Sequence, residues 1–273
     1  MLQSVPTIRS VVKTGLLAVL NAIGRPDPDR LPALMYHRLG TGGGLLHVSP
    51  EAFEAQMSWL ASAGYRTAGS QTLEAHFAGL PVHGTNVVLT FDDGSDDFAD
   101  LAMPVLERHG FKAIVFAVTG WVDGRLQMTS SPGVSPARSL SWEALGGVLR
   151  AGHEVGSHTV SHADLRSLDD AQLARELSDS RAALEDRLQV RIRLLAYPRG
   201  KYDARTLQAA RAAGYEAAFT TLDGHVRPDD PPFELRRVPV YPDTSMTAFR
   251  QRLGPAMDWW GRWRNPSLRG VTP

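Results

Sequence analysis

Cysteine is absent from this chain of 273 residues. Its absence excludes disulfide bonds, zinc sites built from thiolates and a cysteine nucleophile. Proteins without cysteine function on either side of a bacterial inner membrane, so this absence does not assign a compartment.

An excess of charge of either sign is also missing, because 29 basic residues balance 29 acidic ones. No overall electrostatic field draws the chain towards nucleic acid or anionic lipid. We therefore expect a neutral or locally polar substrate and no nucleic-acid partner. Separately, we expect a monomer. The length is sufficient for one large α/β domain with a sizeable core.

The chain has no apolar run near its N-terminus that is long enough to span a bilayer. The stretch from Gly15 to Ile23, which follows Arg9 and Lys13, is too short. No clear cleavage site precedes the proline-containing segment 25–28, so we interpret residues 1–32 as an amphipathic or signal-like segment with a linker. We expect a peripheral membrane contact and a place in the cell envelope or periplasm, with the cytoplasm as the alternative.

Short β-rich runs alternate with helical patterns along the rest of the chain, which is typical of parallel βα units. Seven runs have the character of strands and predict a barrel. They are Ala33–Tyr36, Val87–Phe91, Ala113–Val118, His153–Ser157, Ile192–Tyr197, Ala217–Thr221 and Arg237–Val240. Helices are predicted after the cap Ser49 and over 97–108, 141–151, 169–188 and 203–213.

These elements predict a single catalytic domain over 33–254 and a C-terminal tail over 255–273. The tail carries a tryptophan cluster, 259–263, that we interpret as packing or a membrane-interface contact. The stretch 121–139 is rich in Gly, Pro and Ser and predicts a loop that walls a site, with Trp121 and His47 as further candidates for lining the cleft.

Polar residues directly follow several of the predicted strands. They are His37, Asp92, Asp93, His158 and the pair Tyr197-Pro198. In α/β barrels the C-terminal ends of the strands form the catalytic face, so these residues converge on one rim by topology.

The two acidic and two imidazole side chains suggest a metal site. Asp92 and Asp93 end an apolar strand, and His158 and His162 stand four residues apart, which would place both rings on one side of a helical turn. Taken alone, the Asp pair is also compatible with a turn beside Gly94, and such His pairs also occur on ordinary surfaces. Together they form an oxygen and nitrogen ligand set suited to zinc, which indicates a metal-dependent hydrolase.

These segments resemble the polysaccharide deacetylases, which are carbohydrate esterase family 4 with its NodB-homology domain. The resemblance rests on Thr90-Phe91-Asp92-Asp93-Gly94 and Ser157-His158-Thr159-Val160-Ser161-His162, and it extends over about 33–240. Leu34-Met35-Tyr36-His37-Arg38 and Ala196-Tyr197-Pro198 resemble the branch that contains poly-β-1,6-N-acetylglucosamine deacetylases.

The resemblance implies a distorted (β/α)7 barrel and a role for each polar residue. It implies Asp92 as the general base, and Asp93, His158 and His162 as ligands of one divalent ion. Zinc is expected, with cobalt, nickel or manganese as alternatives. In the resembled branch the acid histidine maps onto His37, although a histidine after a strand is also compatible with a buried structural role.

The third family motif departs from the usual pattern. The family commonly has Arg-Pro-Pro-aromatic-Gly there, whereas this chain has Ala196-Tyr197-Pro198-Arg199-Gly200. We expect Tyr197, Pro198 and Arg199 to contact the substrate, with the backbone N–H of Arg199 facing the oxyanion.

The usual base-orienting arginine is missing from that motif. Arg236 or Arg237 could contact the base instead, and a surface or structural role is the alternative for both. No histidine follows His225, so the C-terminal acid motif of most family members is absent, which favours His37.

The sequence therefore predicts a hydrolase that removes N-acetyl groups from N-acetylhexosamine units of a cell-envelope glycan, exopolysaccharide or glycolipid precursor. One alternative is an amidohydrolase of the same fold that acts on a small amide or ureide. The other is a catalytically silent glycan-binding domain.

Overall fold

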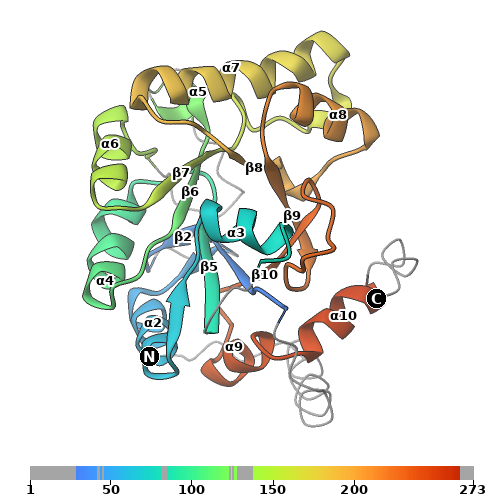
Figure 1. The fold of residues 1–273 in the computed structure, drawn as a ribbon. Coiled ribbons are helices and arrows are strands. Elements are labelled where there is room, and N and C mark those ends of the chain that lie inside the picture. The colour runs from blue at the N-terminus through green and yellow to red at the C-terminus, as the bar shows by residue number, and fades with distance from the viewer. Residues whose placement is uncertain are drawn as a thin grey trace.

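The computed structural model describes residues 29–264 apart from 42–43, 45, 81–84, 123, 125 and 128–137. Seven parallel strands close into a barrel (Figure 1), because β1 pairs with both β5 and β10. In barrel order they are β1 (Ala33–Tyr36), β5 (Thr85–Phe91), β6 (Ile114–Ala117), β7 (Glu154–Ser157), β8 (Leu194–Ala196), β9 (Ala217–Asp223) and β10 (Leu235–Pro239). The predicted (β/α)7 barrel and its seven strands are confirmed.

Helices lie between most of the barrel strands in the sequence and cover the barrel (Figure 1). They are α2 (Pro50–Ser62), α3 (Ser70–Phe77), α4 (Met103–Arg108), α5 (Thr119–Val122), α6 (Trp142–Arg150), α7 (Asp170–Leu188), α8 (Ala204–Ala212), α9 (Met246–Arg252) and α10 (Ala256–Arg264). The predicted caps are confirmed, because Ser49, Ser141, Asp169 and Asp203 each accept a hydrogen bond from the first turn of a helix.

Three short strands were not predicted: β2 (Arg38–Leu39), β3 (His47–Val48) and β4 (Tyr65–Thr67). The predicted helix 97–108 also differs in its first half, which is a π-helical turn, Phe98–Ala102, before α4. Pro104 lies early in α4 and has no N–H to donate to the preceding turn, which accounts for the irregular start.

Side chains of alternating residues fill the barrel interior, as the period of two in a strand requires. One buried cluster contains interior residues from six of the seven strands, all but β7, and includes Val88, Phe116 and Phe219. Leu73 of α3 belongs to the same cluster, so α3 closes the N-terminal end of the barrel (Figure 1). The opposite end, where the strands finish, stays available for a site.

Helix α10 packs against β9, so residues 256–264 belong to the folded body. Met257 is fully buried, and Asp258 accepts a hydrogen bond of 2.8 Å from the backbone N–H of His225. In the described part of the chain, no helix combines the length and apolarity of a membrane span. Three expectations fall outside the described residues: the amphipathic or signal-like character of residues 1–28, the loop predicted over 121–139 where it covers 128–137, and the contacts of the side chains of Trp259 and Trp263.

Candidate active site

The predicted site residues lie at the C-terminal rim of the barrel. His37, Asp92, His158 and Tyr197 come directly after β1, β5, β7 and β8. Direct contacts join three of the four strand ends, because His37 reaches Asp92 and His158 reaches Asp93. The topology of parallel strands thus brings together residues that are distant in the sequence.

Asp93, His158 and His162 form the centre of the site. Asp93 Oδ1 lies 3.6 Å from Nε2 of His158 and 3.6 Å from Nε2 of His162. One ligand atom from each residue falls within 4.8 Å of the others. Ligands at the bond lengths typical of zinc lie about 3.4 Å apart at the corners of a tetrahedron. The three side chains therefore fit one divalent ion.

The segment that carries both histidines is an irregular loop, so the predicted helical turn is wrong. Thr159 and His162 both have left-handed backbone conformations, with φ of 71° and 59°. This path brings the two rings together, with centroids 4.9 Å apart. Glu176 of α7 accepts hydrogen bonds from the loop, a contact that no sequence motif indicated.

The surroundings of each histidine suit a metal ligand. The carbonyl of Ala196 lies 2.7 Å from His158 Nδ1, which fits a ring that donates from Nδ1 and leaves Nε2 for a cation. Burial and then the adjacent His158 lower the pKa of His162 to about 4, against the opposing charge of Asp93. Trp121, a weaker candidate from the sequence, packs against His162 with ring centroids 5.3 Å apart.

Asp92 lies beside this centre and is paired with a buried arginine. Arg237 donates to both carboxylate oxygens of Asp92, at 2.7 and 2.8 Å. Burial alone would raise the pKa of Asp92, but the facing guanidinium of Arg237, followed by the ring of His158, holds it well below its usual range. Asp92 is therefore ionised near neutral pH.

Arg237 and Arg236 lie on opposite sides of β10, as neighbours in a strand must. Arg237 points into the barrel and contacts Asp92, whereas Arg236 pairs with Asp230 at 2.7 Å and does not reach the base. Of the two arginines that the sequence offered, only Arg237 contacts Asp92.

His37 also lies near the carboxylate of Asp92. Its Nε2 lies 3.9 Å from Asp92 Oδ2, and its side chain is 16% exposed, whereas that of Asp92 is 3% exposed. The position combines access from solvent with proximity to the carboxylate. His47, in contrast, is buried beside the ion pair of Arg38 with Asp97.

The third motif forms a tight turn over Pro198–Gly200 at the end of β8. Tyr197 is fully buried and stacks on Tyr202, so its side chain packs inside the protein. Arg199 is exposed and has a left-handed backbone, with φ of 56°. Within the part of the chain that the structure describes, the N–H of Arg199 has no hydrogen-bond partner.

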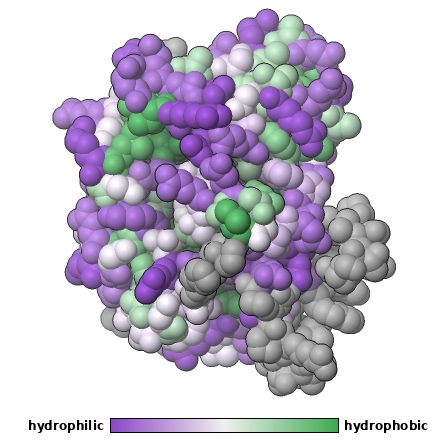
Figure 2. Space-filling view, in the orientation of Figure 1, coloured by the Kyte–Doolittle hydropathy of each residue, from purple (hydrophilic) through white to green (hydrophobic). Residues whose placement is uncertain are grey.

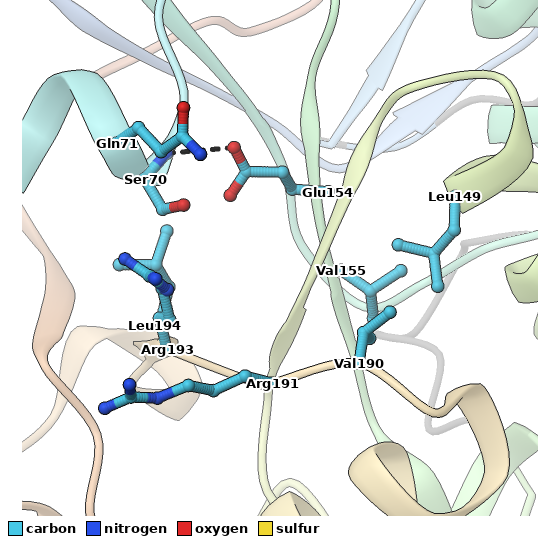
Figure 3. Close-up of a pocket in the computed structure, with 9 residues that line it drawn as sticks. All are labelled: Ser70, Gln71, Leu149, Glu154, Val155, Val190, Arg191, Arg193 and Leu194. Atoms are coloured by element: carbon cyan, nitrogen blue, oxygen red, sulfur yellow. Dashed lines mark hydrogen bonds between the residues drawn. The ribbon is translucent and has the colours of Figure 1, made fainter.

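A hollow of about 260 Å³ lies at the other end of the barrel (Figure 3). It is lined by the first residues of β7 and β8, Glu154 and Leu194, and by Arg191 and Arg193. Glu154 accepts from the N–H of Ser70 at the start of α3. The face in Figure 2 is mostly hydrophilic, with one larger hydrophobic area over the region of α6 and β7. None of the predicted site residues lines this hollow.

The fold and site define an α/β-barrel hydrolase, with two imidazoles and a carboxylate that could hold a metal next to a buried aspartate. The sequence pattern of the family described as polysaccharide deacetylase matches residues 80–218, about half of the chain. YxkH of Bacillus subtilis (strain 168), named as a candidate polysaccharide deacetylase, is 32% identical over 228 residues, which are 81% of this chain and 75% of YxkH. The chain belongs to the polysaccharide deacetylase family.

Two further relatives agree with this assignment. The deacetylase PplD of Streptococcus pyogenes, solved in complex with acetate, superposes with a TM-score of 0.74 and 26% identity, over 84% of this chain and 100% of that one. The poly-β-1,6-N-acetyl-D-glucosamine N-deacetylase of Escherichia coli (strain K12) is 37% identical over 79 residues, 29% of this chain and 12% of that protein. The predicted family is confirmed, and the chain is a hydrolase of acyl amide bonds.

Proposed function

We propose that this protein is a metal-dependent N-deacetylase acting on N-acetylhexosamine units of a cell-envelope glycan or exopolysaccharide. The arrangement of Asp92 next to Asp93, His158 and His162 carries the proposal, because it places an ionised carboxylate beside a three-ligand cation site. The local similarity to a poly-β-1,6-N-acetyl-D-glucosamine N-deacetylase supports this substrate class. Zinc suits the ligand set best, since one carboxylate and two imidazoles favour it.

An amide is a poor electrophile and its amine is a poor leaving group, so both ends of the bond need assistance. A divalent cation, when bound, supplies Lewis-acid activation of the acetyl carbonyl and of water. Asp92 accepts a proton from the attacking water as the new C–O bond forms. Arg237 holds both oxygens of Asp92, which fixes the direction from which that proton is accepted.

The C–N bond breaks when the nitrogen receives a proton. His37 is the group placed to donate it, because its ring is accessible and lies 3.9 Å from Asp92. The products are acetate and a free amine on the sugar, and the proton taken by Asp92 balances the one given by His37. The free backbone N–H of Arg199 is a candidate donor to the oxyanion.

The decisive experiment measures acetate release from N-acetylglucosamine oligomers, with β-1,4 and β-1,6 linkages, by protein stripped of metal and then reloaded with zinc or cobalt. We expect release by the reloaded protein and none by Asp92→Asn, which keeps the ligands Asp93, His158 and His162. If the wild type and Asp92→Asn behave alike on all glycans, the proposal fails. Activity on small amides or ureides alone would instead support the amidohydrolase alternative.

A further inference from the structure

The loop 158–162 presents two metal-ligand candidates, and its backbone N–H groups can be followed one by one. The N–H of His158 donates to Ala117 O, at 2.9 Å, which continues the strand pairing. The N–H groups of Thr159 and His162 donate to side chains within the same segment, Ser157 Oγ and Thr159 Oγ1. The remaining two, of Val160 and Ser161, need an acceptor from elsewhere.

Glu176 of α7 supplies that acceptor. Its Oε2 accepts from the N–H groups of Val160 and Ser161, at 3.0 and 2.9 Å. Its Oε1 accepts from the Ser161 hydroxyl, at 2.6 Å. One half-buried carboxylate therefore makes three hydrogen bonds to the centre of the loop, and charge-assisted bonds of this kind are stronger than neutral ones.

The opposite side of the loop is held by α5. The N–H of Thr119 donates to Thr159 O at 3.1 Å, and the N–H of Gly120 donates to Val160 O at 2.8 Å. The loop thus lies between the start of α5, which binds its carbonyls, and Glu176, which binds its N–H groups. Removal of one side would leave the middle of the loop held from the other side.

The loop needs such restraint because its conformation is unfavourable. Thr159, a β-branched residue, and His162 both adopt positive φ. A left-handed backbone is strained for a non-glycine residue, and it persists only when its surroundings determine the conformation. A freed loop would relax towards negative φ, which changes the direction of the His162 side chain relative to Asp93.

We propose that Glu176 is a positioning residue that locks the 158–162 loop in the conformation in which His158 and His162 can bind the same cation. The inference rests on the proposed metal site and adds a residue from a different helix to it. Partners that orient ligands in this way typically change metal affinity by about 10- to 100-fold when they are removed.

Two substitutions separate the geometry of Glu176 from its charge. Glu176→Gln keeps the shape, because the amide oxygen can accept from both N–H groups and the amide nitrogen can donate to the Ser161 hydroxyl. Glu176→Ala removes all three contacts. Asp179→Ala, an exposed carboxylate one turn along α7, is the matched control for loss of charge on this helix.

The measurement is the zinc dissociation constant of each metal-free protein, obtained by competition with a chromophoric chelator. We expect binding by Glu176→Ala to be about 10- to 100-fold weaker, binding by Glu176→Gln to stay within about 5-fold of wild type, and Asp179→Ala to be unchanged. Ser161→Ala, which removes one of the three bonds, should weaken binding in the same direction by a smaller factor. This milder variant also serves if Glu176→Ala does not fold.

Equal zinc affinity in wild type, Glu176→Ala and Ser161→Ala would overturn the inference. An equal loss in Glu176→Gln and Asp179→Ala would also overturn it, because charge alone would then explain the effect. The zinc measurement uses no substrate. If the protein deacetylated none of the tested glycans, the proposed function would be refuted, but the zinc affinities would still test the role of Glu176.

Discussion

The guanidinium of Arg237 donates hydrogen bonds to both carboxylate oxygens of Asp92 inside the barrel, and neither side chain has appreciable access to solvent. Arg237 is also fixed by Thr220 O, at 2.8 Å, and by Thr90 Oγ1, at 3.2 Å. The ring of Phe219 lies beneath it, 5.7 Å from the guanidinium carbon. The aspartate that we propose as the base is therefore held by a residue far from it in the sequence.

Removal of this arginine should damage both stability and activity. We expect Arg237→Met to lower the free energy of unfolding by about 3–5 kcal/mol, because it leaves the Asp92 charge buried without a partner. Its kcat should fall at least about 100-fold, since the carboxylate loses its orientation. Urea denaturation and acetate release measure the two effects.

The matched control is Arg236→Met, which breaks the outward pair with Asp230. This variant is expected to lose stability as well but to keep its kcat, because Arg236 does not contact Asp92. Equal kcat losses in the two variants would contradict a specific role of Arg237 in orienting the base.

The role of His37 can be tested through the leaving group of the substrate. An amine leaves only when it is protonated, so hydrolysis of an N-acetyl group needs a general acid. A phenol is a good leaving group, so hydrolysis of an activated acetyl ester of a phenol needs a general acid much less. We expect His37→Gln to lower kcat on an N-acetylated oligomer by about 100- to 10,000-fold and to change ester hydrolysis far less. Parallel loss on both substrates would show that His37 supports the site structurally instead.

The strands and the rim of the barrel could be predicted because polar residues directly follow four of the strands, β1, β5, β7 and β8. A buried apolar run followed by Asp92 and Asp93, or by His158, marks the residue at which a strand ends. Because parallel strands all end at the same edge of the barrel, these residues are expected to lie together. The inward direction of Arg237 also follows from strand alternation, but only once the limits of β10 are known, and the predicted strand began at Arg237 itself.

Other parts of the site had no local signal. Glu176 lies in a helix rich in charged residues, and nothing in that helix shows which carboxylate faces the metal loop, because the rotation of α7 depends on tertiary packing. The two histidines suggested a helical turn by their spacing, yet tertiary hydrogen bonds impose left-handed residues there instead. Short β4 was missed because its three residues are no more than half-buried and lack an apolar pattern.

The stability of the protein should depend on pH through His153. Burial, with a smaller effect of Lys112, lowers the pKa of His153 from 6.5 to about 4, and its Nδ1 accepts a hydrogen bond from the N–H of Ala113. The folded state therefore favours the neutral ring. The resulting stability is complete above pH 6.5 and is lost as the pH falls towards 4, because the unfolded chain takes up the proton first.

The variant His153→Asn tests this expectation. Its side-chain oxygen can accept from the same N–H but does not titrate. Between pH 7 and pH 4.5, the metal-free wild type should lose about 2 kcal/mol more unfolding free energy than the variant, as measured by urea denaturation at each pH. An identical loss in both proteins would exclude His153 as the source.

A glycine at the start of α5 should control the metal loop from the side opposite α7. A Cβ added at Gly120 would lie 2.5 Å from the carbonyl oxygen of Val160, the atom that accepts the Gly120 N–H. We expect Gly120→Ala to push the loop away, to destabilise the fold by about 1–3 kcal/mol and to weaken zinc binding by the metal-free protein.

The comparison for this variant is Gly147→Ala in α6, where the nearest atom to an added Cβ is the end of the Arg150 side chain, at 3.7 Å. Alanine is the better helix former, so this variant should be more stable than wild type by about 0.5–1 kcal/mol and should bind zinc equally well. Unchanged zinc affinity in Gly120→Ala, together with a normal fold, would mean that the loop tolerates displacement. Because the left-handed Thr159 and His162 leave the loop little freedom to adjust, we expect weaker binding.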